Sequence, residues 1–461
     1  MTSPPTFPAL IDRAAAQAGP GVGVVMPRER ATYVEFAARS VELARRLRAA
    51  GIGRGDRVGL LFNACVDSYA LLVGAMRLGA IPVPVNVRFK PRELEYAIGK
   101  AGMKAVVTDP AYAGGLLEPG VAGSARIVVG ADDPEFADAG ELVDPAEVEE
   151  AQAALGPDDD ALMFFTSGTT AHPKGCVHRH LALVAEGERF AERIGLGPDD
   201  RFWTPLPFFH VGGLDVLSAA AAASCAGYHL PHFDAGVALD QLADGVTVAF
   251  PAFETIWLAV LNHERFAETD LSALRIVINV AVPASLRAMQ ERLPTATQIS
   301  CFGSTETTGF ACVGVPGDSL EARTTTSGKP LRDVEVRVVD PETGEERRPG
   351  EPGELVVRGP TRFMRYHDDP EATAATIDAD GWYHSGDLGR KDAEGRISFA
   401  GRLKDMLKVG GENVSAAEVE GLLVEHPAVE IVQIVGARDA KYVEVAAAFV
   451  QLRKGATCTR C

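Results

Sequence analysis

Positive charge is scarce in this chain. The sequence holds 45 lysines and arginines against 63 aspartates and glutamates, which gives a formal net charge of −18. A protein that binds nucleic acid or an acidic membrane surface needs a basic face. We therefore expect neither kind of partner.

Long apolar runs and targeting segments are also absent. No stretch of about 18 apolar residues, the length of a membrane-spanning helix, is free of charges and helix breakers. The N-terminus Met1-Thr2-Ser3-Pro4-Pro5 lacks the basic and then apolar plan of a signal peptide. These absences predict no membrane insertion and a cytoplasmic location.

Cysteine is rare, and most of the cysteines lie far apart in the sequence. Isolated cysteines in apolar or mixed surroundings are typical of buried free thiols, and five fit this description: Cys65, Cys176, Cys225, Cys301 and Cys312. Cys458 and Cys461 have C-x-x-C spacing. Because no second pair lies nearby, we expect no zinc site there.

The chain has no internal repeat and no low-complexity tract, and its 461 residues leave room for several domains. Its first part alternates helical and strand patterns. Helices are expected at 33–50, 71–78 and 93–101, and strands at 57–62, 81–85 and 105–108. Such alternation predicts an α/β fold with mostly parallel sheets covered by helices.

The pattern changes after Gly328-Lys329-Pro330. Segments 334–339 and 354–358 alternate apolar and polar residues and are separated by turn-forming sequence. This predicts a small antiparallel subdomain at about 330–401. The acidic stretches 132–150 and 157–160 are expected to be solvated loops.

Residues 165–175 concentrate phosphate-binding groups. The segment contains the hydroxyls of Thr166, Ser167, Thr169 and Thr170, the flexible Gly168 and the cation of Lys174. Hydroxyls and backbone N–H groups can surround phosphate oxygens, and a lysine adds charge. The order is not that of a Walker A loop. From residue types alone, a solvated loop fits equally well.

The same segment closely resembles the phosphate loop of the adenylate-forming superfamily, which includes acyl-CoA synthetases. Further segments resemble the motifs of that superfamily, in the same order: 78–86, 205–213, 301–306, 381–387, 401–405 and 410–413. On these motifs the chain is identified as a member of the acyl-CoA synthetase family. The resemblance implies an adenylate-binding domain at 1–401 and a small mobile α+β domain at 402–461.

The reaction that the resemblance implies begins with attack of a carboxylate on the α-phosphate of ATP. An acyl-adenylate and pyrophosphate form, and the thiol of coenzyme A then displaces AMP. Both steps concentrate negative charge, so hydroxyls, a lysine and Mg²⁺ are needed to stabilise it. We favour CoA ligation over a peptide-synthetase module because no carrier-protein motif follows, and over a luciferase because no motif demands oxygenation.

The resemblance also implies a nucleotide site. In it, the β- and γ-phosphates contact the 166–170 loop and Lys174, and Thr305 contacts the α-phosphate. Adenine stacks on Phe302, a tyrosine in most relatives, beside Gly303 and Ser304. Glu306 binds Mg²⁺, and Asp387 with Arg402 binds the ribose. From the residues alone, Thr166 and Ser167 could instead cap a strand-to-helix turn. Glu306 could instead be a helix N-cap, and Asp387 a surface aspartate of an ordinary Gly-Asp turn.

Further roles follow from the resemblance for residues nearer the thiol. His210 lies between the acyl pocket and the thiol channel, Lys404 is the hinge, and Gly410 and Gly411 line the channel, where glycine lets the backbone approach closely. Lys408 is expected to face the site after hinge rotation. The alternatives are a core histidine at position 210 and a solvated strand-edge lysine at position 408.

The acyl pocket is expected to be apolar. The residues assigned to it are Phe209, His210, Val211, Phe253, Val280, Ala281, Cys301, Gly303, Thr308 and Gly309. They predict an uncharged hydrophobic acid, aromatic or alicyclic as readily as aliphatic. Tryptophan at position 309 is expected to exclude bulky acids.

Three departures from the family pattern affect the expected activity. Ala171 replaces a glycine of the phosphate loop, and Val280 and Ala281 stand where relatives have two glycines. The sequence ends at Cys461, before the family segment P-x-x-x-x-G-K whose lysine serves adenylation. Either the sequence is truncated or the protein has given up a half-reaction. Two alternatives to full ligation follow: thioester formation from an adenylate made by a separate enzyme, or a non-catalytic protein that binds acyl-adenylates.

Overall fold

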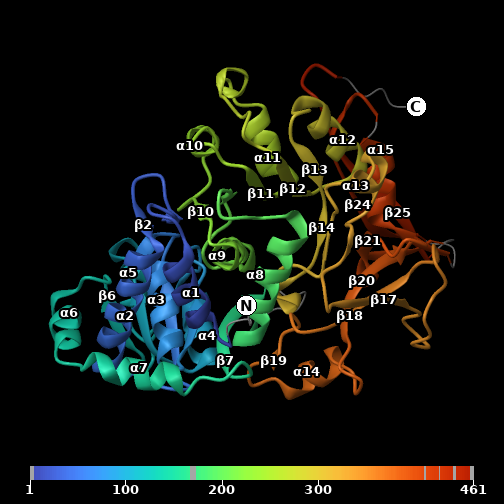
Figure 1. Ribbon diagram of the computed structural model, residues 1–461. Helices are drawn as coiled ribbons and strands as arrows, with labels where there is room; N and C mark the ends of the chain where they lie inside the picture. The colour runs from blue at the N-terminus through green and yellow to red at the C-terminus, as the bar shows by residue number, and fades with distance from the viewer. Residues whose placement is uncertain (1–4, 167–172, 410–411, 425, 440–442, 457–461) are drawn as a thin grey trace.

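The computed structural model describes residues 5–166, 173–409, 412–424, 426–439 and 443–456. Figure 1 shows the N-terminal elements gathered on one side, the C-terminal elements on the other, and helices α8 and α9 between them. Within the described residues, no helix is both long and apolar enough to cross a membrane.

A four-stranded parallel sheet, ordered β4-β3-β5-β6, forms the N-terminal part. Its strands are β3 (Arg57–Leu61), β4 (Ile81–Pro84), β5 (Met103–Thr108) and β6 (Arg126–Val129). The helices of this part are α1 (Phe7–Gln17), α2 (Tyr33–Ala49), α3 (Val66–Arg77), α4 (Pro91–Ala101) and α5 (Ala113–Leu116). The predicted alternation is confirmed. Helix α2 begins where Thr32 and Glu35 form a reciprocal cap.

A seven-stranded sheet, ordered β13-β12-β11-β9-β10-β1-β2, lies beside the first. Its strands are β1 (Gly23–Val25), β2 (Arg30–Thr32), β9 (Arg201–Thr204), β10 (Ala226–His229), β11 (Val248–Phe253), β12 (Ile276–Val280) and β13 (Thr297–Ile299). All neighbours are parallel except β1 and β2. Its helices are α8 (His180–Ile194), α9 (Val211–Ala223), α10 (Ala235–Leu242), α11 (Glu254–Leu261) and α12 (Pro283–Arg292).

The phosphate-loop segment connects two antiparallel strands, β7 (Asp160–Thr166) and β8 (Lys174–Arg179). Strand β19 (Arg365–Tyr366) pairs with β8, and helix α14 (Pro370–Thr376) follows it. Thr166 is the last residue of β7, while Ser167 lies outside the described residues.

Antiparallel pairing dominates after residue 300, and it includes the antiparallel sheet predicted after Gly328-Lys329-Pro330. Strands β14 (Cys301–Phe302), β15 (Cys312–Val313) and β16 (Lys329–Pro330) form one sheet, and helix α13 (Leu320–Thr325) lies between the last two in the chain. A second sheet, ordered β17-β18-β20-β21, contains β17 (Glu335–Val339), β18 (Gly353–Arg358), β20 (Tyr383–Lys391) and β21 (Ile397–Arg402).

The C-terminal part has its own four-stranded sheet, ordered β23-β22-β25-β24. It contains β22 (Met406–Val409), β23 (Glu412–Ser415), β24 (Val429–Asp439) and β25 (Val443–Leu452), with helix α15 (Ala416–Val424). Because β22 pairs with both β23 and β25, it is an inner strand. The interpretation of Lys408, which lies on β22, as a strand-edge lysine is therefore wrong.

The acidic stretch 132–150 is not a loop, contrary to expectation. It forms most of helices α6 (Pro134–Glu141) and α7 (Pro145–Ala153). Asp133 and Asp144 cap their N-termini, each followed by a proline at the first helical position. Phe136 and Val148 are buried. The acidic residues therefore start helices that each bury one apolar anchor.

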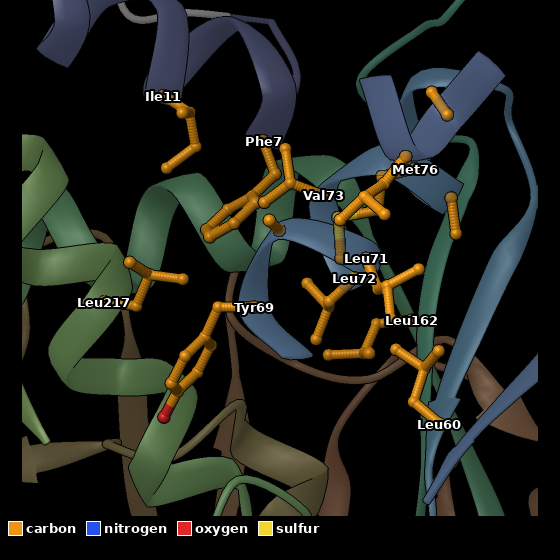
Figure 2. Packing of buried hydrophobic residues seen from close by; sticks show 14 of the residues in the cluster. Phe7, Ile11, Leu60, Tyr69, Leu71, Leu72, Val73, Met76, Leu162 and Leu217 are labelled. Atoms are coloured by element: carbon orange, nitrogen blue, oxygen red, sulfur yellow. The ribbon is translucent and has the colours of Figure 1, made fainter. Parts of the chain in front are cut away.

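The largest apolar core joins the N-terminal sheet to helices α8 and α9. Figure 2 shows Phe7 and Ile11 of α1, Tyr69 of α3, Leu162 of β7 and Leu217 of α9 among its members. Each such side chain contributes about 1.5–3 kcal/mol when fully buried. The Tyr69 hydroxyl donates to the carbonyl of Gly213, 3.2 Å away, which ties α3 to the first turn of α9. The core thus fixes the helix that carries part of the site.

Candidate active site

A cavity of about 690 Å³ lies where the second sheet meets the phosphate-loop strands. Its walls include the carboxyl-terminal ends of β7, β11 and β12, together with the chain after β14 and the start of α9. Ligands of open α/β sheets bind at this edge, and the volume is in the range of small-molecule sites. The cavity is therefore the candidate active site.

Its phosphate end is organised around a tyrosine that the sequence analysis missed. The Lys174 ammonium lies 4.8 Å from the centre of the Tyr366 ring, and the Tyr366 hydroxyl donates to Glu306 Oε1 at 2.8 Å. Burial and the neighbouring Glu306 raise the pKa of Tyr366, so it stays a donor. Thr166 and Thr305 line the same end. Ser167, Gly168, Thr169 and Thr170 lie outside the described residues.

The segment after β14 brings Gly303, Ser304, Thr305 and Glu306 together. Thr305 and Glu306 lie in a short 3-10 helix that starts just past the strand. A Cβ atom at Gly303 would lie 1.8 Å from the carbonyl oxygen of Gly309, so only glycine permits this approach of two backbones. The N-cap of that helix is Ser304, so the interpretation of Glu306 as a helix N-cap is wrong, and the Glu306 side chain lines the cavity.

A second cavity, of about 220 Å³, adjoins the first and shares Val280, Cys301, Gly303 and Arg402 with it. Phe302 lies in its wall, with its ring centre 6.2 Å from that of Phe399 and a 25° angle between the planes. Phe399 was not singled out in the sequence. Both rings line the second cavity and give it a flat apolar wall, on which a purine base can stack.

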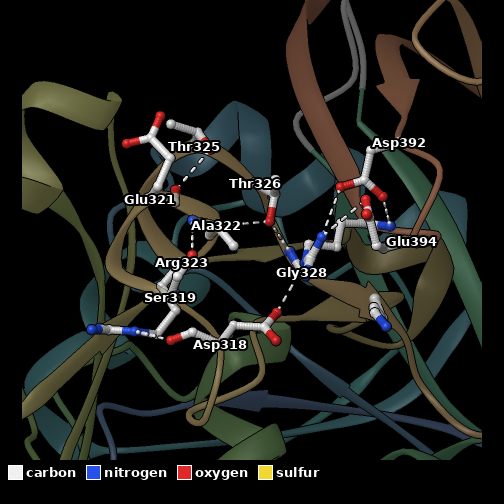
Figure 3. Close-up of polar contacts among 12 residues, drawn as sticks. Asp318, Ser319, Glu321, Ala322, Arg323, Thr325, Thr326, Gly328, Asp392 and Glu394 are labelled. Atoms are coloured by element: carbon white, nitrogen blue, oxygen red, sulfur yellow. Dashed lines mark hydrogen bonds and ion pairs between the residues drawn. The ribbon is translucent and has the colours of Figure 1, made fainter.

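The far wall of the second cavity is the segment Thr324–Ser327. Figure 3 shows how polar contacts hold this segment and the turn before it. Arg396 bridges Asp318 at 3.0 Å and Asp392 at 3.1 Å, and the Thr326 hydroxyl donates to the carbonyl of Ala322 at 2.7 Å. The antiparallel subdomain thereby fixes the wall of this cavity.

Asp387 and Arg402 meet because β20 and β21 pair them directly. Arg402 Nε lies 2.9 Å from Asp387 Oδ1. Asp387 is 4% exposed, and burial raises its pKa to about 6 although Arg402 opposes the shift. The preceding part of β20 is held by Glu354, which accepts from the Gly386 N–H at 3.0 Å and contacts His384 Nδ1 at 2.9 Å. A buried carboxylate in this setting can accept two vicinal hydroxyls.

His210 is not a core residue, so the core-histidine interpretation is wrong. It caps the N-terminus of α9, where its Nδ1 accepts from the Gly212 N–H at 3.1 Å. In the neutral ring the proton therefore resides on Nε2. The ring is exposed into the main cavity, and the atoms crowded around it lower its pKa. The buried core histidines are His178, His180 and His229.

Most residues assigned to the acyl pocket line the main cavity: His210, Val211, Phe253, Val280, Cys301, Gly303 and Gly309. Ala281 lines the second cavity. Thr308 lines neither, because its side chain is buried against His178 Nδ1, 3.0 Å away, and the carbonyl of Thr361, 2.6 Å away. Phe209 is half-buried on the turn before His210 and also lines neither.

One acidic residue, Asp215, interrupts the apolar end of the cavity. Asp215 belongs to no predicted site, although its place in an apolar helical segment of the sequence is a signal. Asp215 is the single charged residue of α9, whose other positions are apolar or small. A charged side chain in a buried apolar helix usually has a specific structural or functional role.

The segment that contains Lys404, the predicted hinge, borders the cavity. Arg402, Leu403 and Lys404 line its rim, and Lys404 lies in a short 3-10 helix, Leu403–Asp405, between β21 and β22. Gly410 and Gly411 lie outside the described residues. Among the residues that the structure describes, no group of three or more His, Cys, Asp or Glu side chains is placed to hold a metal ion. Mg²⁺ that is shared with substrate phosphates needs only one or two protein carboxylates. Glu306 can supply one such carboxylate from the cavity wall.

Comparison with known proteins gives the family. Residues 10–367 match the AMP-binding enzyme family. The chain is similar to 4-coumarate–CoA ligase 2 of Oryza sativa subsp. japonica, with 31% identity over 91% of this chain and 78% of that protein. It is also similar to the long-chain-fatty-acid–CoA ligase FadD13 of Mycobacterium tuberculosis (strain ATCC 25618 / H37Rv), with 32% identity over 91% of this chain and 83% of that protein.

A solved structure agrees. The ATP-bound MatB from Rhodopseudomonas palustris superposes with a TM-score of 0.88 and 29% identity, over 98% of this chain and 90% of that one. The family match, the relatives and the fold coincide with the motifs that line the two cavities. The chain therefore belongs to the AMP-binding enzymes of the adenylate-forming superfamily, in the family of acyl-CoA synthetases and ligases.

Proposed function

We propose that this protein activates a hydrophobic carboxylic acid with ATP, through an acyl-adenylate, and transfers the acyl group to coenzyme A. One observation carries the proposal. A single cavity is lined by Lys174, Thr305 and Glu306, by His210, and by a set of apolar side chains. A carboxylate seated in the apolar part would point at the phosphate end.

The residues of the two cavities suit a nucleotide. The second cavity, with Phe302 and Phe399 in its wall, would hold adenine. Asp387 would accept the ribose hydroxyls while Arg402 holds the carboxylate in place. Lys174, oriented by the Tyr366 ring, would contact the phosphates. The 166–170 loop is proposed to close over them.

Glu306 is the carboxylate proposed to bind Mg²⁺. Its hydrogen bond from Tyr366 fixes the carboxylate orientation without adding a competing charge. The ion would neutralise phosphate charge as pyrophosphate leaves. His210, with a proton on Nε2, would orient the acyl carbonyl from the cavity side.

The C-terminal part, 402–461, is proposed to rotate about Lys404 between the two half-reactions. Its sheet pairs only with itself within the described residues, and the chain enters it through the short 3-10 helix at the cavity rim. Gly410 and Gly411 are proposed to line the thiol channel. Lys408 is proposed to face the site after rotation.

A split assay tests the proposal. ATP–pyrophosphate exchange is measured with a panel of acids, beside CoA-thioester formation from pre-made acyl-adenylates. We expect both activities, and Lys174→Met should abolish exchange. Lys104→Met is the matched control, because Lys104 lies in a surface ion pair with Asp56, and it should leave both activities unchanged.

The outcomes separate the alternatives. Thioester formation without exchange would identify an enzyme of the second half-reaction that needs a separate adenylating enzyme. Thermal stabilisation by acyl-adenylates without turnover would identify a non-catalytic binder. Either result would overturn full ligation.

A further inference from the structure

Two buried acids meet at the apolar end of the main cavity. Asp215 on α9 is 2% exposed and lines the cavity, and Glu186 on α8 is 1% exposed and lies behind it. Neither acid belongs to a motif of the nucleotide site. Both lie among side chains where an isolated carboxylate would be costly.

The packing of α8 on α9 brings the two acids together. The Ser218 hydroxyl, one turn after Asp215, donates to the carbonyl of Leu183, one turn before Glu186, at 2.7 Å. A Cβ atom at Gly187 would lie 2.3 Å from Ser218 Oγ, so a glycine beside Glu186 permits the close approach. The pair is therefore held by the helix interface and does not depend on a mobile loop.

No cation balances the pair. In the described part of the chain, neither acid forms an ion pair with Lys, Arg or His, and both carboxyl oxygens of Glu186 lack a hydrogen-bond partner. The cations that line the cavity, Lys174, Arg402 and Lys404, belong to its phosphate end and rim. The ionisable neighbour from another wall is Cys301, which is itself buried.

Burial raises the pKa of both carboxyl groups, and each opposes ionisation of the other. The pair therefore keeps at least one proton near neutral pH and offers an O–H donor. A buried donor without an acceptor is unfavourable. The acceptor is missing from the described part of the protein and can be supplied by a substrate in the cavity.

We propose that Asp215, backed by Glu186, binds a hydroxyl or keto oxygen on the acid substrate, at the end distant from its carboxylate. The substrate class is then a hydrophobic acid that carries one such oxygen. This inference rests on the proposed function, because it places the acyl group in the main cavity. Gly309 belongs to the same arrangement, since a Cβ atom there would lie 2.0 Å from Asp215 Oδ2.

Binding of matched acyl-sulfamoyl-adenosine analogues tests the inference without requiring turnover. Each pair shares one skeleton and differs by the distal oxygen, for example 3-phenylpropanoyl against 3-(4-hydroxyphenyl)propanoyl and octanoyl against 8-hydroxyoctanoyl. We expect the wild type to bind the oxygenated member about 10- to 100-fold more tightly in at least one pair, as one buried hydrogen bond implies.

Variants locate the preference. Asp215→Leu should bring the ratio of dissociation constants to about one, while Asp215→Asn, which keeps a donor, should retain most of the preference. Glu186→Gln should weaken it less than Asp215→Leu. Glu192→Gln is the matched control, because Glu192 lies on the same helix α8 but in a surface ion pair with Arg332, and it should leave the ratio unchanged.

Three results would overturn the inference. In the first, the wild type binds the oxygenated member of every pair no more tightly than its partner. In the second, the preference survives Asp215→Leu. In the third, the wild type binds an ammonium-bearing analogue more tightly than either member of the pair. If Asp215→Leu does not fold, the wild-type ratios and Asp215→Asn still decide. Absence of ATP–pyrophosphate exchange with all acids would instead count against the proposed function, because analogue binding does not depend on it.

Discussion

The two ends of the main cavity treat charge in opposite ways. At the phosphate end the charged groups have partners: Glu306 accepts from Tyr366, and Lys174 lies over the Tyr366 ring. At the rim, Arg402 pairs with Asp387 of the adjoining second cavity. At the acyl end Asp215 and Glu186 have no cation beside them in the described part of the chain. Paired charges are oriented before the ligand arrives, whereas the two buried acids keep at least one proton, whose acceptor a ligand would supply.

The comparison teaches which end tolerates change. When one partner is lost at the phosphate end, the remaining charged side chain is no longer held in place at the point where the reaction develops negative charge. Loss of an acid at the apolar end removes a costly buried group and should alter selectivity more than rate. Four predictions test this contrast.

The largest effect is expected at Glu306. Glu306→Gln keeps the size and the hydrogen bond from Tyr366 but removes the charge proposed to bind Mg²⁺. Exchange activity should fall roughly 10²- to 10³-fold, as on removal of one group that stabilises developing charge. Steady-state ATP–pyrophosphate exchange measures it. Glu335→Gln, in a surface ion pair with Arg358, is the control. Unchanged exchange would remove Glu306 from the reaction.

The next effect concerns Gly309, at the acyl end. Its φ of +88° is unfavourable for any side chain, and a Cβ atom would collide with Asp215. Gly309→Ala should therefore lower the free energy of unfolding by about 1–3 kcal/mol, and Gly309→Trp should both destabilise the fold and exclude bulky acids. Thermal melts and an acid panel measure the two effects.

A double-mutant cycle separates strain from collision at this position. If the collision dominates, Asp215→Ala should recover part of the stability that Gly309→Ala loses. Additive losses would assign the cost to the backbone alone. Exchange rates that do not change across acid sizes in Gly309→Trp would remove Gly309 from the acyl pocket.

The third prediction uses the pH dependence of Asp387. Its pKa is raised to about 6 in the fold, so the fold favours its protonated form, and the stability that this gives is lost as pH rises through about 6. The proposed ribose contact needs the carboxylate. ATP affinity should therefore fall as pH drops below about 6, approaching roughly tenfold per pH unit.

Isothermal titration with ATP between about pH 5 and pH 8 measures this dependence. Asp387→Asn should bind more weakly at the upper end of the range and should show a flatter profile. His384 is another titrating group of the same strand, β20. Burial lowers its pKa, but its contacts with Glu354 and Asp378 raise it overall. His384→Gln, which should keep the profile, is therefore the matched control. A profile that persists in Asp387→Asn would contradict the assignment.

The smallest effect is expected at Phe302. Phe302→Tyr restores the family's usual hydroxyl without removing the ring that faces Phe399. One added hydrogen bond contributes about 0.5–1.5 kcal/mol, so ATP should bind about 2- to 10-fold more tightly. Titration with ATP measures the change. Phe399→Leu should weaken ATP binding. Unchanged ATP affinity in this variant would exclude Phe399 from the adenine site.

Much of the phosphate end could be predicted from the sequence because its parts are local. Thr305 and Glu306 follow a strand within a few residues, and the context of Asp387 is a short motif, so their neighbours in the chain identify them. The alternation of helices and strands was predicted for a similar reason, since periodicity is a local property. The prediction of a loop at the acidic stretch was wrong because aspartate before proline starts helices as well as loops.

The sequence by itself determined the family, the alternating α/β plan and the residues that lie on contiguous motifs. Only the tertiary structure decided that Tyr366 holds Glu306, that Phe399 faces Phe302, that Thr308 points away from the cavity and that Asp215 meets Glu186. The physical reason is sequence separation. These contacts join segments that no local pattern relates, and they form only when sheets and helices pack around a common core.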